Sequence, residues 1–275
     1  MHRNHLISIV AVWAVLCSWA VAEGVGESDS FHGPVGLQLY SLRNQFKEDG
    51  VTKTLDVVRD WGFKYVEVAG TYGMTIPEFR KELDQRGLVA IGSHFPFNRL
   101  SDDIDGVIKD AKQLGIKYVG CAWIGHKAPF DKEHCLNAAD VFYAAGEALA
   151  KEGMKFYYHN HGYEFYQHGD GTVFDLLMES TDPRYVFYQM DVLWTVFPAQ
   201  DPVKLLKKYP NRWLLLHLKD LKKGVETGSL AGKTDLTNDV ALGTGQVDWP
   251  SLLEACQEVG VKYYFIEDES PTVIK

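Results

Sequence analysis

The tetrapeptide Gly62-Phe63-Lys64-Tyr65 follows a helical pattern and opens a strand pattern, and the chain repeats this arrangement three more times. Each copy contains Gly, an apolar residue, Lys and an aromatic residue; the others are Gly115-Ile116-Lys117-Tyr118, Gly153-Met154-Lys155-Phe156 and Gly260-Val261-Lys262-Tyr263. Glycine suits the residue just after a helix because it adopts a positive φ without steric cost. The repeat therefore indicates helices that each pass directly into a buried strand.

Apolar runs predict eight strands separated by helical patterns. We expect the strands at residues 35–40, 64–69, 88–93, 117–122, 154–160, 185–191, 212–218 and 261–267. We expect helices at residues 51–61, 75–85, 101–114, 131–152, 172–179, 201–209 and 249–259. Strands that are apolar throughout and alternate with helices form parallel sheets covered by those helices. Eight units at a spacing of about 30 residues predict a single-domain α/β fold, the (β/α)8 TIM barrel. A doubly wound sheet is disfavoured because no Gly-x-Gly-x-x-Gly fingerprint follows the first strand.

The N-terminal segment is predicted to be a signal peptide over residues 1–22. It carries Arg3, an apolar run from Leu6 to Val21 and the small-residue site Ala20-Val21-Ala22. The run is shorter than the roughly 20 residues of a membrane span, so we expect an exported protein, periplasmic or secreted, without a stable span after cleavage. A linker over 23–34 and the barrel over 35–275 complete the expected organisation. Only eight residues follow Glu267, so the eighth helix is expected to be missing or truncated.

Composition excludes several classes of protein. The net charge is −9, with 37 acidic and 28 basic residues, and this balance argues against nucleic acid as a partner because phosphate binding depends on Lys and Arg. Three cysteines lie beyond the signal segment, at Cys121, Cys135 and Cys256, and an odd number does not predict a disulfide framework. The sequence leaves the oligomeric state open and is compatible with a homo-oligomer.

Polar side chains follow the predicted strands, at the points where the strands end. In chain order they are Gln38, Tyr40, Glu67, His94, Trp123, His159, His161, Glu164, Asp191, Trp194, His217, Lys219, Asp220 and Glu267. The carboxyl ends of barrel strands share one face, where active sites form. Mixed carboxylate and imidazole ligands favour one divalent ion, such as Mn²⁺, Mg²⁺, Co²⁺ or Zn²⁺. The longest unpatterned segment, 222–245, is expected as a loop at the same face.

Several of these motifs together resemble a known family. They are Gly36-Leu37-Gln38-Leu39-Tyr40-Ser41-Leu42-Arg43, Tyr158-His159-Asn160-His161, Met190-Asp191-Val192-Leu193-Trp194, His217-Leu218-Lys219-Asp220, Leu242-Gly243-Thr244-Gly245-Gln246-Val247-Asp248-Trp249 and Ile266-Glu267. In this order they are similar to the sugar phosphate isomerase/epimerase superfamily of xylose-isomerase-like TIM barrels, from about Val35 to Glu269. That group includes ketose 3-epimerases, inosose dehydratases, 3-keto-glycoside processing enzymes and, more distantly, endonuclease IV. The set is specific for the superfamily and unspecific for the reaction.

The resemblance implies one divalent metal held by Glu, Asp, His and Glu from strands five to eight. Asp191, His217 and Glu267 match the last three positions, whereas His159 stands where the epimerases place the first Glu. Either His159 replaces that carboxylate, or Glu164 reaches back from the following loop. The sequence-based preference is Glu164, because His159 and His161 are then free for substrate and proton transfer.

The resemblance also implies a chemistry. A divalent ion acts as a Lewis acid on a sugar carbonyl, so that a side-chain base removes the α proton and an enediolate forms. The leading hypothesis is an isomerase or epimerase of an unphosphorylated or keto sugar, with a dehydratase or lyase as the alternative. His159, His161 and Lys219 are the expected catalytic residues, and Glu164 or Glu267 is a possible base. The substrate, a small carbohydrate, is expected to contact Gln38, Tyr40, Glu67, His94, Trp123, Trp194 and Asp220.

Two further classes stay open at the sequence level. An endonuclease-IV-like hydrolase is disfavoured by the acidic charge, the export signal and Trp194, where those enzymes often carry a histidine. A barrel that binds sugar without catalysis is the other. Metal analysis separates it from the enzymes.

Overall fold

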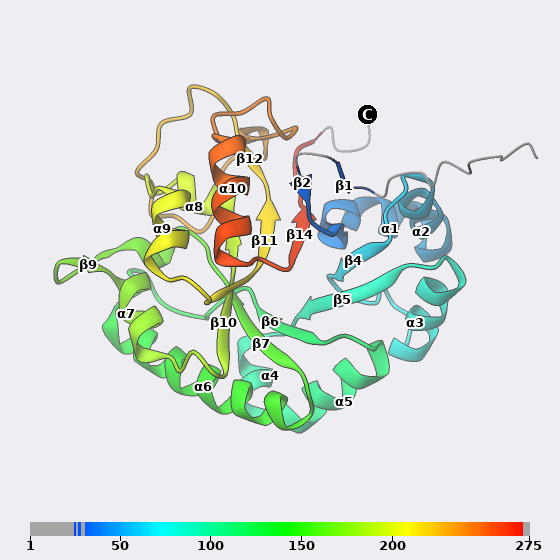
Figure 1. Cartoon of the computed structure of the whole chain (residues 1–275). Helices are drawn as coiled ribbons and strands as arrows, with labels where there is room; N and C mark the ends of the chain where they lie inside the picture. Colours follow the sequence, from blue (N-terminus) through cyan, green and yellow to red (C-terminus); the bar gives the residue numbers. More distant parts are fainter. Residues whose placement is uncertain (1–24, 26, 29–30, 272–275) are drawn as a thin grey trace, which may run out of the picture.

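Eight parallel strands close into a barrel in the computed structural model, which describes residues 25, 27–28 and 31–271 (Figure 1). The expected α/β barrel is confirmed. In chain order its strands are β3 (Val35–Gln38), β4 (Tyr65–Val68), β5 (Val89–His94), β6 (Tyr118–Cys121), β7 (Lys155–His159), β10 (Val186–Asp191), β11 (Trp213–Leu218) and β14 (Tyr263–Ile266). Each strand pairs with the next along the chain, and β14 pairs with β3 to close the ring.

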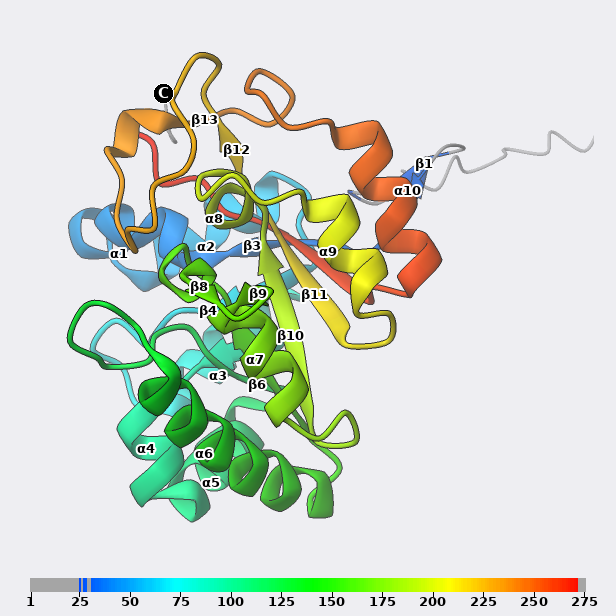
Figure 2. The same ribbon diagram turned by 90° about the vertical axis from the view of Figure 1, so that its left-hand side faces the viewer.

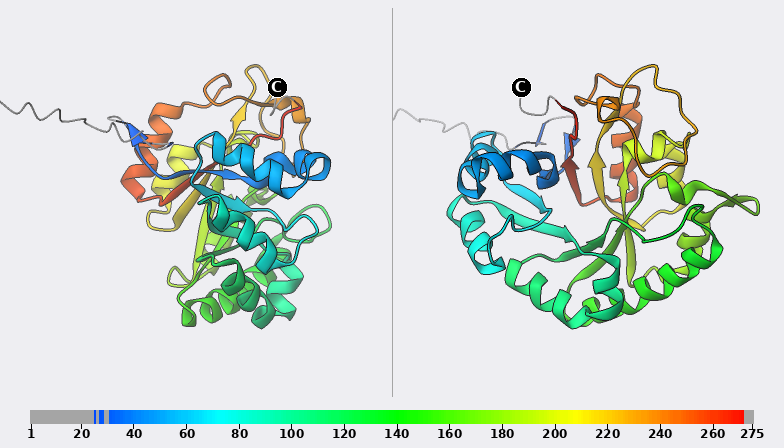
Figure 3. Two further views of the ribbon diagram at one scale, coloured as in Figure 1. Left: turned by 90° about the vertical axis from the view of Figure 1, so that its right-hand side faces the viewer. Right: turned by 180° about the vertical axis from the view of Figure 1, so that it is seen from behind.

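Helices surround the strands, as Figures 2 and 3 show from the sides and from behind. They are α1 (Arg43–Asp49), α2 (Val51–Asp60), α3 (Ile76–Gln85), α4 (Phe97–Asp102), α5 (Ile104–Leu114), α6 (Lys132–Lys151), α7 (Val173–Ser180), α8 (Val192–Val196), α9 (Pro202–Lys208) and α10 (Trp249–Val259). Three 3-10 turns are η1 (Leu39–Leu42), η2 (Tyr163–Phe165) and η3 (Leu236–Asn238). Among the described residues, three two-stranded antiparallel sheets pair β1 (Glu27–Ser28) with β2 (Phe31–His32), β8 (Gln167–His168) with β9 (Gly171–Thr172), and β12 (Asp220–Leu221) with β13 (Asp239–Val240).

Where the sequence predicts one helix, over residues 101–114, the structure has parts of two. The segment 101–114 belongs to two helices, α4 and α5, that meet at Asp103. Asp103 has a non-helical backbone and its carboxylate accepts the Gly106 N–H, so the acidic start signal caps the second helix. The other six predicted helices end within two residues of their observed bounds. The short helices α1 and α8 were not predicted, because five to seven residues carry little periodicity.

Side-chain alternation along β7 divides the interior into two layers. Tyr157 points into the barrel, where it packs in one cluster with Ile91, Leu215 and Phe265. Tyr158 points outward and joins the larger cluster between the strands and the helices. Partly buried Tyr65, Tyr118, Phe187 and Tyr263 from the strands' first halves pack against the inner cluster. These aromatic side chains fill the amino-terminal end of the barrel, so a site can open only at the carboxyl end.

Both chain ends carry sequence-based predictions that the structure tests only in part. The predicted signal peptide lies outside the described residues. The predicted linker contains the β1–β2 hairpin, and the Phe31 ring packs edge-on against Tyr264 at 5.1 Å between centroids. Within the described part of the chain, residues 267–271 follow β14 without a helix. None of the helices described is both long and apolar enough to cross a membrane.

Candidate functional site

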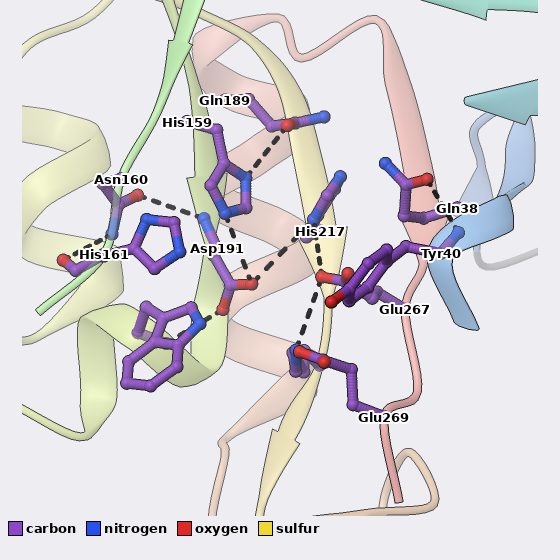
Figure 4. A network of polar contacts seen from close by, with 12 residues as sticks. Gln38, Tyr40, His159, Asn160, His161, Gln189, Asp191, His217, Glu267 and Glu269 are labelled. Carbon is purple, nitrogen blue, oxygen red and sulfur yellow. Dashed lines mark hydrogen bonds and ion pairs between the residues drawn. The ribbon is translucent and has the colours of Figure 1, made fainter. Parts of the chain in front are cut away.

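Three predicted ligands meet at the carboxyl end of the barrel. Asp191 ends β10, His217 lies near the end of β11 and Glu267 follows β14, and one ligand atom from each lies within 4.8 Å of the others. His217 Nδ1 lies 3.0 Å from Glu267 Oε2 and 3.9 Å from Asp191 Oδ2 (Figure 4). All three side chains are buried. Barrel closure thus brings together residues that are up to 76 positions apart in the chain, as the sequence predicts.

The carboxylate of Asp191 has a buried oxygen that a bound cation would pair. Its Oδ1 accepts the Trp194 N–H at 2.9 Å, whereas its fully buried Oδ2 has no hydrogen-bond partner among the described residues. Burial raises the pKa of Asp191 to about 7, because desolvation of the carboxylate outweighs the attraction of Lys219 and His217. His159 Nε2 lies 3.9 Å from the same oxygen. An unpaired buried oxygen that faces two imidazole nitrogens and a second carboxylate fits a divalent ion.

Glu67 orients His217 from below. Its Oε2 lies 2.5 Å from His217 Nε2, and a carboxylate can only accept, so this nitrogen carries the proton. Burial opposes a charge on the imidazole, yet Glu67 and Glu267 raise the pKa of His217 to about 10. The second proton then lies on Nδ1, toward Glu267. A divalent ion would take the place of that proton, since metal ligands must give up theirs.

Gln189 orients His159 in the same way. Its amide Nε2 donates to Glu67 Oε1 at 2.9 Å, so its Oε1 faces His159 Nδ1 and His94 Nε2, each at 3.0 Å. An amide oxygen accepts, so both imidazole nitrogens donate. Burial lowers the pKa of His159 well below its usual value, which keeps the ring neutral. The lone pair of His159 therefore lies on Nε2, the nitrogen that faces Asp191.

Glu164, the sequence-based preference for the fourth ligand, lies elsewhere. The turn η2 folds its side chain against the outer face of β7, where Oε1 accepts the Tyr158 hydroxyl at 2.5 Å and the His161 N–H at 2.8 Å. Two groups of described side chains are close enough to share an ion, Asp191 with His217 and Glu267, and His94 with His159 and His217. Glu164 belongs to neither, whereas His159 belongs to the second group and lies 3.9 Å from Asp191 Oδ2. The geometry therefore favours His159 over Glu164, because strand alternation directs His159 into the barrel.

A cavity of about 520 Å³ opens above these residues. Ten predicted site residues line it: Gln38, Tyr40, His94, Trp123, His159, His161, Trp194, His217, Lys219 and Glu267. Tyr40 and Trp123 are each 44% exposed, so their rings are available to the apolar face of a sugar. The cavity lining does not include Asp191, Glu67 or Asp220, and Asp191 Oδ2 lies 3.9 Å from the lining residues His159 and His217. The lining therefore combines aromatic surfaces with the imidazoles and carboxylates of the predicted ring.

Lys219 lies in this lining among three carboxylates. Its Nζ is 2.6 Å from Glu269, 3.4 Å from Glu267 and 3.8 Å from Asp239, and the side chain is 3% exposed. Burial opposes the charge, but these carboxylates outweigh it and raise the pKa of Lys219. Lys219 is therefore a permanent ammonium group at the edge of the cavity.

Sequence reasoning missed Asp239 and the cavity wall at residues 232–236. Both belong to the predicted loop 222–245, which carries no periodic pattern. The only available signal was the position of this long loop at the carboxyl face. Figures 1 and 2 show the segments around β12 and β13 above the carboxyl ends of β10 and β11.

Asp220 holds that loop in place. Its buried carboxylate accepts the N–H groups of Gly243, Gly245 and Val247 and the indole N–H of Trp249, at 2.9–3.3 Å. A Cβ at Gly245 would lie 2.1 Å from Asp220 Oδ1, so the close approach requires glycine. Residues of the motif from Leu242 to Trp249 thus donate hydrogen bonds to the Asp220 carboxylate. The structure shows Asp220 as an anchor for the cavity wall.

Comparison with known proteins assigns the family. The sequence profile described as "Xylose isomerase-like TIM barrel" matches residues 55–272. The chain belongs to this family. Its relatives include an inosose dehydratase of Clostridium beijerinckii, 26% identical over 212 residues that make up 70% of each chain. A Parabacteroides distasonis structure described as a sugar phosphate isomerase/epimerase is 26% identical, with a TM-score of 0.70 over 87% of this chain and 91% of that one.

A structure of the IOLI protein, described as holding a zinc atom, shares the fold. It has a TM-score of 0.69 at 16% identity and covers 87% of this chain and 90% of that one. The resemblance read from the sequence motifs is confirmed at the level of the xylose isomerase-like family.

Replacing Glu67 with glutamine in this xylose isomerase-like barrel is expected to weaken divalent-metal binding about 10- to 100-fold, because carboxylate partners of metal-binding histidines contribute that much. The change removes the charge that fixes the His217 proton on Nε2. Isothermal titration of the metal-free protein with Mn²⁺ measures the effect. Glu254→Gln removes an exposed acid on α10 and serves as the control for net charge. Equal affinities for both variants would contradict the orienting role of Glu67.

Asp220→Ala is expected to destabilise the fold by about 3 kcal/mol, since it leaves several buried N–H groups without their charged acceptor. Urea denaturation monitored by circular dichroism measures this loss. Asp220→Asn retains one acceptor oxygen and should lose less. A change below about 0.5 kcal/mol in the alanine variant would show that the loop does not depend on this carboxylate.

Proposed function

We propose that this protein is a metal-dependent enzyme that removes the proton next to the carbonyl of an unphosphorylated keto sugar and then expels a β-oxygen substituent. The observation that carries the proposal is the buried Asp191 Oδ2, which has no hydrogen-bond partner among the described residues and is grouped with His217, Glu267 and His159, three residues of the cavity lining. Family membership supports a sugar-processing enzyme, because the relatives are named as inosose dehydratases and sugar isomerase/epimerases.

The residues that would hold the ion are Asp191, His217, Glu267 and His159. When bound, a divalent ion such as Mn²⁺, Mg²⁺, Co²⁺ or Zn²⁺ would supply the Lewis acidity that makes a proton next to a carbonyl labile. These four side chains provide two carboxylates and two imidazoles, a donor set that suits hard and borderline cations.

His161 is the proposed proton acceptor. It lines the cavity, and its Nδ1 has no hydrogen-bond partner among the described residues. Burial, assisted by the Lys219 ammonium, lowers the pKa of His161 to about 3. The imidazole is therefore neutral at physiological pH and its lone pair is free. It is a weak base in the empty cavity, and negative charge that develops on a bound substrate would raise its pKa.

Lys219 is the proposed partner of that base. Its ammonium group can donate a hydrogen bond to an oxygen that gains negative charge during the reaction. In an elimination, His161 would take the α proton, a carbon–carbon double bond would form as the β carbon–oxygen bond breaks, and the protonated His161 would return the proton so that the oxygen leaves as water or an alcohol. Lys219 would donate a hydrogen bond to an oxygen that gains negative charge in this step.

The charge of the cavity supports a substrate without phosphate. Two lysines in the lining, Lys219 and Lys233, stand against the carboxylates Asp235, Asp239, Glu267 and Glu269. A bound divalent ion would offset this excess of negative charge and would leave the cavity without a surplus of positive charge for a phosphate dianion, which suits a neutral carbohydrate. Tyr40 and Trp123 provide the exposed aromatic surfaces for its C–H groups.

Isomerisation or epimerisation, the leading hypothesis from the sequence, is the second candidate. It begins with the same deprotonation and differs in where the proton returns. The Parabacteroides distasonis structure at 26% identity, described as a sugar phosphate isomerase/epimerase, favours it. Elimination is placed first because the relatives compared at the level of sequence are named as inosose dehydratases.

One incubation in D₂O separates these reactions. The Mn²⁺-loaded protein is mixed with an inosose or a 3-keto-glucoside, and products are followed by NMR and mass spectrometry. Loss of water or of the aglycone supports elimination. Deuterium incorporation with altered stereochemistry and no lost group supports epimerisation. Absence of both product formation and solvent exchange from both substrates would contradict the proposal.

We also propose that the protein is exported, on the basis of the apolar N-terminal pattern over residues 1–22. Export agrees with an unphosphorylated substrate, since cells retain sugar phosphates inside. Cell fractionation followed by N-terminal analysis of the mature protein tests it. A protein that retains Met1 and stays with the cytosolic fraction would contradict this assignment.

A further inference from the structure

The buried carboxyl group of Glu164 is connected to the cavity lining through hydrogen bonds and ring contacts, and not through a metal ion. Its side chain is fully buried, and both hydrogen bonds reach one oxygen, Oε1. One comes from the Tyr158 hydroxyl and the other from the backbone N–H of His161. Glu164 therefore fixes the backbone at the residue that carries the proposed proton acceptor.

A chain of hydroxyl groups extends from Glu164 to the end of β6. The Tyr158 hydroxyl lies 2.9 Å from the Tyr163 hydroxyl, which accepts the Ile124 N–H at 3.1 Å. Tyr158 donates its single proton to Glu164, so the Tyr163 hydroxyl is the donor in the bond between the two tyrosines. All donors in this buried chain point toward one carboxyl oxygen, Oε1, whereas Oε2 has no hydrogen-bond partner among the described residues. The hydrogen bonds to Oε1 hold Tyr158, Tyr163 and the His161 backbone in fixed relative positions.

The ring of Tyr163 connects this chain to the cavity lining. It stacks on the His161 imidazole, with 5.7 Å between centroids and 12° between planes. It also meets the Trp123 indole edge-on at 4.8 Å. His161 and Trp123 both line the cavity, so a shift of Tyr163 would move a proposed base and an aromatic wall together.

We propose that Glu164, acting through Tyr158 and Tyr163, is a positioning residue that orients His161 and Trp123 in the cavity. Glu164 in this role is not a metal ligand. The inference relies on the proposed function only for the part that His161 plays in proton transfer. The orientation itself is a property of the fold.

Two substitutions at Glu164 test the proposal. Glu164→Gln retains Oε1 as an acceptor, whereas Glu164→Leu removes it. Cys135→Ala is the matched control, because Cys135 is buried in the same outer core and its recorded hydrogen bond goes to the Val173 carbonyl. Each variant is examined for bound Mn²⁺, for the ¹⁵N signals of the histidine rings, and for kcat and KM. The His161 signals are assigned from a His161→Gln spectrum.

We expect both Glu164 variants to retain one Mn²⁺ per chain. The glutamine variant should keep the His161 ring signals and a kcat within about threefold of the wild type. The leucine variant should shift those signals and lower kcat about 100-fold with little change in KM, the cost of misplacing a reacting group by about 1 Å. Cys135→Ala should leave the His161 signals and kcat unchanged.

Several outcomes would overturn the assignment. Loss of Mn²⁺ from both Glu164 variants would make Glu164 a ligand, and unchanged His161 signals in the leucine variant would remove the positioning role. If the wild-type protein shows no turnover, the proposed function fails while the ring signals still decide the positioning. Should the leucine variant not fold, Tyr163→Phe retains the ring, breaks the hydroxyl chain and is expected to shift the same signals. Unchanged His161 signals in the Tyr163→Phe variant would also contradict the proposal.

Discussion

Asp191→Asn is expected to abolish metal-dependent activity by lowering the affinity for a divalent ion at least about 1000-fold. Asparagine retains the acceptor for the Trp194 N–H but replaces the unpartnered Oδ2 with an amide group. The NH₂ group cannot bind a cation. Since one oxygen of Asp191 faces both His217 and His159, no other described side chain is placed to replace it.

The free energy of unfolding should respond in the opposite direction in the metal-free protein. Burial of an unpartnered carboxyl is costly, as its raised pKa of about 7 indicates, and an amide carries no charge to desolvate. We therefore expect the metal-free variant to melt at or above the temperature of the metal-free wild type. The rise in melting temperature that Mn²⁺ gives the wild type should be absent.

Thermal denaturation with and without Mn²⁺ measures both effects. Asp175→Asn is a suitable control, because Asp175 caps α7 and pairs with Lys208 away from the barrel mouth. That variant should lose stability and keep the response to metal. An Asp191→Asn protein that binds Mn²⁺ as tightly as the wild type would remove the basis of the proposed metal site.

Lys219→Met is expected to lower kcat about 100- to 1000-fold while the protein still binds metal, the range seen when a preorganised donor to developing charge is removed. Methionine fills a similar volume, but it leaves Glu267, Glu269 and Asp239 without their shared cation. The extra negative charge should strengthen rather than weaken the binding of a divalent ion. The loss should therefore fall on the chemical step.

Steady-state kinetics and metal titration on the same preparation measure these two quantities. Lys233→Met is the matched control, because it removes the exposed ammonium group from the rim of the same cavity. We expect its kcat to fall by less than tenfold. A Lys219→Met variant with a kcat within fivefold of the wild type would exclude a role in the reaction for this ammonium group.

Local sequence was sufficient for the barrel and for much of its polar ring. Apolar runs mark strands because a parallel strand is buried on both faces, and Gly62 adopts φ +86° three residues before the start of β4. Once the barrel closes, residues that follow successive strands must share one face. Asp191, His217 and Glu267 were therefore predictable as a group, although none is near another in the chain.

Three features were decided only by tertiary structure. Glu164 and His159 are both plausible ligands in the sequence, and the choice between them depends on the side of β7 from which each side chain leaves. Asp239 reaches Lys219 through a loop without periodic pattern. Asp220, beside Lys219 in sequence, turns away from the cavity to bind the backbone of that loop.

The physical reason is that the two sets of features depend on interactions that act over different separations along the chain. Burial of apolar runs and the freedom of glycine act within a few residues, so sequence alone determined the strands, most helices and the end of the barrel that carries the polar groups. The direction of a single carboxylate depends on which donors a turn or a loop from another part of the chain brings within 3 Å. Only the folded chain determines those partners, and they separate the residues that face the cavity from those that hold its walls.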